Sequence, residues 1–223
     1  ELGNKNLDTQ RSNKKLERDL LSGFMTLIKD PYLVSIGIFI LLYVAMNTFV
    51  YFELRKFLID FDRDTRTQIW ASIDLVVNLL AITTAIFATN RIAIRFGMPL
   101  TLAMIPLLMI FGWMAVAVSP ILMVLIGLQI IRRAGNYAIT KPGREMLFTM
   151  VSNEARYKAK PVIDIVIYRG GDMLTAWFYT LLTASFGLGL NLIALIAACL
   201  ASLWAFTGVY LGRKYNIQKD IVI

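Results

Sequence analysis

The fold is decided by Gln129-Ile-Ile-Arg-Arg-Ala-Gly-Asn-Tyr137 and by Tyr168-Arg-Gly-Gly-Asp172, two stretches that place charges within long hydrophobic runs. The runs, residues 121–140 and 162–186, are close to the roughly 20 residues that a helix needs to cross a hydrocarbon core of about 30 Å. Charged side chains at that depth are costly and usually face a bundle interior or a water-filled cavity. The two stretches therefore predict a pair of membrane helices whose charges form a site.

The composition excludes an ordinary soluble domain. Hydrophobic residues make up 57% of the 223 residues, charged residues only 17%, and the mean hydropathy is +0.63. The net charge of +8 does not indicate nucleic-acid binding, because the lysines and arginines lie between the apolar runs and form no basic face with interleaved aromatics. We therefore expect a membrane protein whose positive charge sets its topology, with no nucleic-acid partner.

Residue types that carry much of enzyme and metal chemistry are scarce. The chain has no histidine, and its one cysteine, Cys199, lies in an apolar run. A disulfide framework, a cysteine zinc site and a Ser-His or Cys-His nucleophile are thereby excluded. We expect neither a cofactor nor a metal, so charge chemistry within the membrane falls to Asp, Glu, Lys, Arg or Tyr.

Six apolar runs are each long enough for a membrane helix. They cover residues 32–52, 69–90, 98–118, 121–140, 162–186 and 188–211. We predict an all-α membrane protein with a six-helix transmembrane bundle over residues 32–211, a cytoplasmic linker over residues 1–31 and a cytoplasmic tail over residues 212–223. The apolar residues of the linker recur at near-helical spacing opposite its lysines, which fits either an amphipathic helix on the membrane surface or a solvated linker.

The distribution of basic residues tests this count. Lysines and arginines accumulate in the amino-terminal segment, in the loops after the second and fourth runs, and in the tail, all on one side of a six-span bundle. The loop after the first run instead balances its four basic residues with Glu53, Asp60, Asp62 and Asp64. We therefore expect both termini on the cytoplasmic side.

Several polar side chains fall near the middle of the predicted spans. Counted from the helix ends at about 1.5 Å per residue, Arg132 and Arg133 lie roughly 18 Å deep and Asp172 roughly 16 Å deep. Because Asp164, Tyr168 and Asp172 follow one another at intervals of four, they should line one helix face. The predicted substrate-binding residues are Asn47, Arg132, Arg133, Asn136, Tyr137, Tyr168, Arg169 and Asp172.

Charge pairing is one interpretation of these residues, since three arginines match Asp74, Asp164 and Asp172 in number and buried pairs can hold helices in register. Two adjacent arginines point about 100° apart on a helix, however, and cannot both meet one carboxylate. Near the midplane all three arginines face only Asp172, with which Arg169 can pair along the helix. This local positive excess suits an anionic small molecule, because guanidinium groups bind carboxylate and phosphate bidentately.

A second set of residues is predicted for gating or charge pairing. The set consists of Asp74, Asn78, Arg91, Arg95 and Asp164. The basic stretch from Arg91 to Gly97 lies between two predicted spans, and it fits either a positive cytoplasmic turn or a gating latch.

Several motifs resemble one known family. They are Phe61-Asp-Arg-Asp-Thr-Arg-Thr67, Ile73-Asp-Leu-Val-Val-Asn78, Gln129 to Ala138, Arg144-Glu-Met-Leu-Phe-Thr149, Arg156-Tyr-Lys-Ala-Lys160, and Asp164 to Asp172. Together they look like bacterial members of the ATP/ADP translocase-related group of the major facilitator superfamily. The resemblance implies a twelve-helix transporter of the bacterial inner membrane, with this chain as its carboxy-terminal half and a missing amino-terminal six-helix half as its partner. It also implies a substrate cavity between the halves, with nucleotide exchange as a candidate activity.

Two other classes of function compete with a transporter. An intramembrane aspartyl enzyme needs carboxylates that converge from separate helices, but Asp164 and Asp172 share one helix, and Gly170-Gly171-Asp172 only partly matches the required glycine pattern. A membrane scaffold has no evident need for three arginines at depth. We therefore predict a secondary transporter, not an enzyme, that moves an anion by alternating access.

Overall fold

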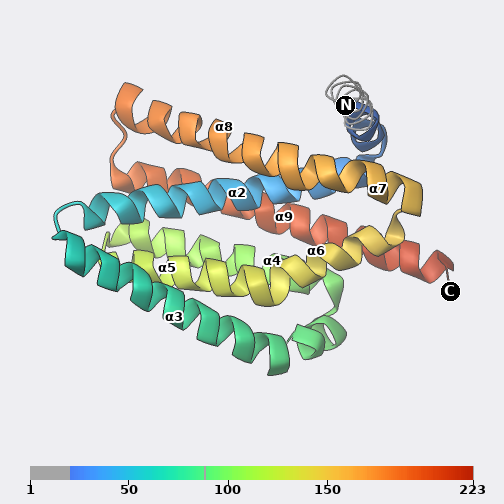
Figure 1. The fold of residues 1–223 in the computed structure, drawn as a ribbon, viewed down its shortest axis with the longest axis horizontal. Coiled ribbons are helices and arrows are strands. Elements are labelled where there is room, and N and C mark those ends of the chain that lie inside the picture. Colours follow the sequence, from blue (N-terminus) through green and yellow to red (C-terminus); the bar gives the residue numbers. More distant parts are fainter. Residues whose placement is uncertain (1–20, 88, 223) are drawn as a thin grey trace, which may run out of the picture.

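The chain forms a bundle of long helices that run side by side along its longest axis (Figure 1). The computed structural model describes residues 21–87 and 89–222, and it describes only the backbone of residues 89–94, 221 and 222. Every regular element within these ranges is a helix. Most of the predicted linker lies outside the described residues, and its residues 21–29 are helical.

Four of the helices are long and undivided in sequence. They are α2 (Pro31–Leu58), α3 (Arg63–Phe87), α4 (Thr89–Val118) and α9 (Leu190–Val222). Two further helical runs are divided into segments. The first consists of α5 (Leu122–Gly135), the π-helix η1 (Asn136–Thr140), α6 (Lys141–Leu147) and the 3-10 helix η2 (Phe148–Met150). The second consists of α7 (Asn153–Pro161), the π-helix η3 (Val162–Ile167), α8 (Tyr168–Thr180) and the π-helix η4 (Leu181–Ser185).

The structure confirms an all-α protein of the membrane-embedded class. Within the described residues, four helices are long and apolar enough to cross a bilayer, over Pro31–Leu58, Arg63–Phe87, Arg95–Val118 and Leu190–Asp220. The fourth and fifth predicted spans fall instead on the two divided runs, whose α5 and α8 have 14 and 13 residues. Neither segment alone is long enough to cross a bilayer.

The first long helix begins where the sequence predicts and ends later. Asp30 caps α2, because its Oδ1 accepts a hydrogen bond of 2.8 Å from the backbone N–H of Tyr32. Pro31 is well suited to the first turn of the helix. The helix continues beyond the predicted end at residue 52, as far as Leu58. The prediction that Glu53 lies in an exposed loop is therefore wrong, because continued helix turns it into the bundle, where only 2% of it is exposed.

A kink interrupts α4 at Gly97, whose φ of 71° lies in the region that favours glycine. The stretch from Arg91 to Gly97, predicted to connect two spans, is not a turn, because its backbone is helical up to this kink. The side chain of Arg91 lies outside the described residues, and that of Arg95 is exposed.

Small residues bring α9 against α4. Ala194, Ala197 and Ala201 are fully buried, as expected of a close helix contact. At Gly212 the contact is so close that an added Cβ would lie 2.3 Å from the Pro99 backbone. These two helices form the tightly packed side of the bundle.

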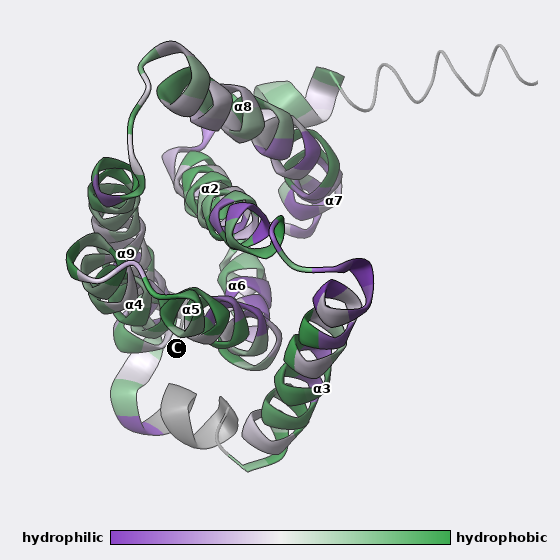
Figure 2. Cartoon of the chain, turned by 90° about the vertical axis from the view of Figure 1, so that its left-hand side faces the viewer, coloured by the Kyte–Doolittle hydropathy of each residue, from purple (hydrophilic) through white to green (hydrophobic). Residues whose placement is uncertain are grey.

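Helix α3 is the loosest member of the bundle. Figure 2 shows it set apart from the other helices, with hydrophobic residues along its length. Only Ile73 and Val77 of this helix are buried. One side of α3 is therefore available to a surrounding membrane or to a neighbouring bundle.

Candidate functional site

A polar cavity of about 440 Å³ opens between the two divided helical runs. We call it the central cavity. Its lining residues are Tyr43, Asn136, Tyr137, Lys141, Arg144, Asp164, Tyr168 and Arg169. The cavity thus brings together Asn136, Tyr137, Tyr168 and Arg169 of the predicted binding set, and Asp164 of the predicted gating set.

Both walls of the central cavity contain a π-helical turn. Asn136 and Tyr137 belong to η1, and Asp164 belongs to η3, directly before Tyr168 and Arg169 of α8. A π turn closes its hydrogen bonds from residue i to i+5, and such turns occur frequently at functional sites. The irregular backbone therefore coincides with the polar residues on both sides of the cavity.

Arg132 does not line the cavity but lies buried beside it, with only 2% of the residue exposed. It donates hydrogen bonds to Gln129 Oε1 at 2.9 Å and to the Tyr43 hydroxyl at 3.4 Å. Its Nε has no hydrogen-bond partner, and no carboxylate among the described residues pairs with it. Arg132 therefore places a buried positive charge directly behind Tyr43, which lines the cavity.

Arg133 points away from the cavity, to an ion pair with Asp74 of α3. Both side chains are partly exposed. The expected divergence of the two adjacent arginines is confirmed, since Arg132 meets α2 and Arg133 meets α3. Arg133 therefore behaves as the charge-pairing interpretation predicts, and not as a lining residue of the central cavity.

A charge network joins α6 to α7 and η3 beside the cavity. Arg144 lies 3.4 Å from Asp164 and 3.5 Å from Glu145, and Lys160 lies 2.6 Å from Glu145. Burial raises the pKa of the Glu145 carboxyl, but its interactions with Lys160 and Arg144 outweigh burial and hold the pKa below its ordinary value. The network ties α6 to α7 and η3 by charge. The predicted pairing of Asp164 with the deep arginines gives way to pairing with Arg144.

Asp172 lies outside the central cavity, contrary to the expectation that it shares a lining face with Asp164 and Tyr168. At its neighbour Gly171, α8 comes so close to α2 that an added Cβ would lie 2.9 Å from Leu41. Asp172 lies near Asn47 and Thr48 of α2. Asn47 and Asp172 are therefore neighbours of each other but not lining residues.

Among the described residues, Arg169 forms no ion pair, although its charge acts on the neighbouring carboxylate of Asp172. Asn78 is exposed on α3, and Arg95 is exposed on α4. Neither residue lines the central cavity. A gating role for Asn78, Arg91 and Arg95 stays a prediction.

Sequence reasoning missed three lining residues, Tyr43, Lys141 and Arg144. Lys141 and Arg144 appeared to belong to a basic loop, because the apolar run ends at Thr140. Their spacing carried the missing signal, since Lys141 follows Tyr137 by four residues and Arg144 follows Lys141 by three. Helix α6 continues this face beyond the apolar run.

The described side chains include no group of three acidic or cysteine residues that converges as a set of metal ligands. Comparisons of the chain with models of protein families, with curated proteins and with solved structures give no match.

Proposed function

We propose that the chain is a six-span bundle that forms half of a secondary transporter for an anionic small molecule. The two divided runs, residues 122–150 and 153–185, extend along the same axis as the four long apolar helices (Figure 1). Each run contains enough residues in sequence to cross a bilayer of about 30 Å. Irregular helix at membrane depth is tolerated where it lines a cavity.

The observation that carries the proposal is the charge of the central cavity. Lys141, Arg144 and Arg169 line it, and Asp164 is its only carboxylate among the lining residues. Lysine and arginine stay charged at physiological pH, and arginine binds carboxylate and phosphate groups bidentately. A surplus of positive charge, reinforced by Arg132 behind Tyr43, favours an anion over a cation or a neutral ligand.

The proposed orientation follows from the same charges. Residues 21–29, α6, α7 and the end of α9 lie at one end of the bundle in Figure 1, and these segments carry nine of the fourteen basic residues outside the apolar runs whose side chains the structure describes. The positive-inside rule assigns that end to the cytoplasm. Both termini are then cytoplasmic, and a bacterial inner membrane is the proposed location.

Transport by alternating access requires a second bundle. The loosely packed α3, of which only Ile73 and Val77 are buried, offers a surface for it. The family resemblance of the sequence supplies the remaining part of the proposal, namely a twelve-helix unit of the major facilitator superfamily. It also makes exchange of ATP and ADP a candidate reaction, and an antiporter a candidate mechanism.

The direct test is uptake of labelled ATP, phosphate and citrate by vesicles that contain the full-length protein. Arg169→Gln removes a cavity-lining cation that forms no ion pair among the described residues, and Arg55→Gln removes an exposed arginine at the other end of the bundle. We expect uptake of at least one anion, lost in Arg169→Gln and retained in Arg55→Gln. Equal uptake by both variants would refute the role of the central cavity.

A further inference from the structure

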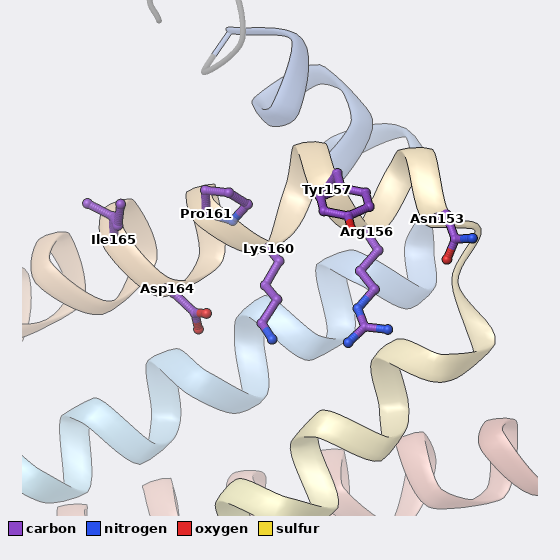
Figure 3. Close-up of a pocket in the computed structure, with 7 residues that line it drawn as sticks. All are labelled: Asn153, Arg156, Tyr157, Lys160, Pro161, Asp164 and Ile165. Carbon is purple, nitrogen blue, oxygen red and sulfur yellow. The ribbon is translucent and has the colours of Figure 1, made fainter.

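A second cavity, of about 530 Å³, adjoins the central one along α7 and η3 (Figure 3). We call it the α7 cavity. Its lining residues are Asn153, Arg156, Tyr157, Lys160, Pro161, Asp164 and Ile165. Asp164 lines both cavities, and it is the one residue that they share.

The polar residues of the α7 cavity form a stripe. Figure 3 shows Asn153, Arg156, Lys160 and Asp164 projecting from the same side of α7 and η3. Their spacing of three or four residues is that of one helix face. Arg156 has no ion pair among the described residues, whereas Lys160 pairs with Glu145 at 2.6 Å. The stripe therefore leads from a free cation at Arg156 to the carboxylate of Asp164.

We propose that the α7 cavity is an approach site for the transported anion, and that Asp164 is a built-in competitor that holds Arg144 until the anion displaces it. The inference rests on the proposed transport function and adds to it a second binding site and a barrier between the sites. The ligand class is an oxyanion group, which is the chemistry that arginine and lysine recognise in common.

Arg144 is held loosely enough to be exchanged. Charge-assisted N–H···O bonds are normally about 2.7–2.9 Å long. The contacts of Arg144 to Asp164 and Glu145 are 3.4 and 3.5 Å, and its buried Nε has no hydrogen-bond partner. Its side chain is also only 16% exposed, so water cannot fully replace the missing partner. An oxyanion that binds Arg144 bidentately would satisfy donors that the carboxylates leave unmet.

The charges on either side of Asp164 favour movement between the two cavities. The cationic lining residues are Arg156 and Lys160 in the α7 cavity, and Lys141, Arg144 and Arg169 in the central cavity. An anion that moves from the α7 cavity to Arg144 therefore leaves one group of cations and meets another. The ion pair of Asp164 with Arg144 is the barrier between them, because Asp164 lines both cavities and occupies Arg144, a cation of the central cavity.

Binding of labelled phosphate, ATP and citrate to the full-length protein in phospholipid-free detergent tests the proposal. If Asp164 occupies Arg144 about nine-tenths of the time, Asp164→Asn should raise the affinity for the bound anion about tenfold. Arg156→Gln should weaken binding about two- to fivefold, the range for one partly exposed charge. Lys158→Gln is the matched control, because Lys158 lies on the same helix, pairs with Glu154 at 2.6 Å and lines neither cavity.

The outcomes distinguish failure of the approach site from failure of the transport function. Unchanged or weaker binding by Asp164→Asn, or equal binding by Arg156→Gln and Lys158→Gln, overturns the approach site while Arg169→Gln still tests the transporter. Wild-type protein that binds none of the three anions overturns both. A lipid headgroup offers the same oxyanion chemistry, so binding is repeated with added phosphatidylglycerol. Loss of anion binding at Arg156 on addition of this lipid assigns the α7 cavity to a headgroup and overturns the approach role.

Discussion

Replacing Tyr179 by phenylalanine removes one hydroxyl from a buried cluster that joins α8 to α2. The Tyr179 hydroxyl donates a hydrogen bond of 2.6 Å to Glu53 Oε1, and the ammonium of Lys56 lies 3.5 Å from the same oxygen. The ring of Tyr179 stacks on Phe52 at a centroid distance of 4.9 Å and meets Phe49 edge-on at 5.3 Å. Phenylalanine keeps these ring contacts, so the substitution isolates the hydrogen bond.

The size of the effect follows from the burial of Glu53. A hydrogen bond to a charged group contributes about 1.5–3 kcal/mol to stability, and a buried group that loses its partner also retains its desolvation penalty. Only the long contact with Lys56 would remain to the Glu53 carboxylate. We therefore expect Tyr179→Phe to lower the free energy of unfolding by about 2–3 kcal/mol, at the upper end of that range.

Unfolding by titration with sodium dodecyl sulfate in mixed micelles measures this difference. Tyr51→Phe is the matched control, because Tyr51 lies on α2 and is 42% exposed. Glu53→Gln in the Tyr179→Phe background removes the stranded charge, so the double variant should lose less stability than the sum of the two single changes. The reasoning would be refuted if Tyr179→Phe were as stable as Tyr51→Phe, or if the stability losses of Tyr179→Phe and Glu53→Gln were strictly additive in the double variant.

Two further predictions concern packing and pH. Gly212→Ala should destabilise the bundle by about 1–3 kcal/mol, because the added Cβ would lie 2.3 Å from the Pro99 backbone. Gly189→Ala is the control, because a Cβ at that position meets nothing within 4 Å. Thermal unfolding in detergent compares the two variants, and equal midpoints would contradict the close contact at Gly212. The lowered pKa of Glu145 means that its ion pair with Lys160 stabilises the fold above the ordinary carboxyl pKa of 4.5 and is lost as the pH falls through the lower folded value. Between about pH 7 and about pH 3, the thermal midpoint of Glu145→Gln should therefore fall less than that of wild type, and parallel curves would count against this role.

Hydrophobic length predicted the helical class and the four long helices because it depends only on local composition. The start of α2 was also predictable, since Asp30 and Pro31 act within one turn of the chain. The end of α2 was not predictable, because a charged residue such as Glu53 is typical of a loop. Its buried hydrogen-bond partner, Tyr179, is distant in the sequence. A charged residue near an apolar run can thus be recognised from the sequence. Whether it lies in a loop or in a continued, buried helix depends on a partner that is distant in the chain.

The candidate site was predictable to the level of the helices but not of every side chain. Asn136, Tyr137, Tyr168 and Arg169 of the predicted set lie on facing walls of one cavity. The π turns η1 and η3 have no signature in the residue pattern, since hydrophobic periodicity reports an average helix. Contacts between helices also have no signature in the sequence, so the close approach of α8 to α2 at Gly171 and the position of Asp172 beside Asn47 could not be predicted.

The pairing of the cations separates those that hold the bundle from those that are free to bind a ligand. Arg133 is committed to Asp74, and the strongest contact of Lys160 is with Glu145, so both link helices. Arg169 faces the central cavity and forms no ion pair among the described residues, and Arg144 shares two long contacts. Arg132 is buried without an ion pair in the described part of the chain, and an unpaired buried charge lowers stability. These unpaired charges are the ones that the proposed anionic substrate would neutralise.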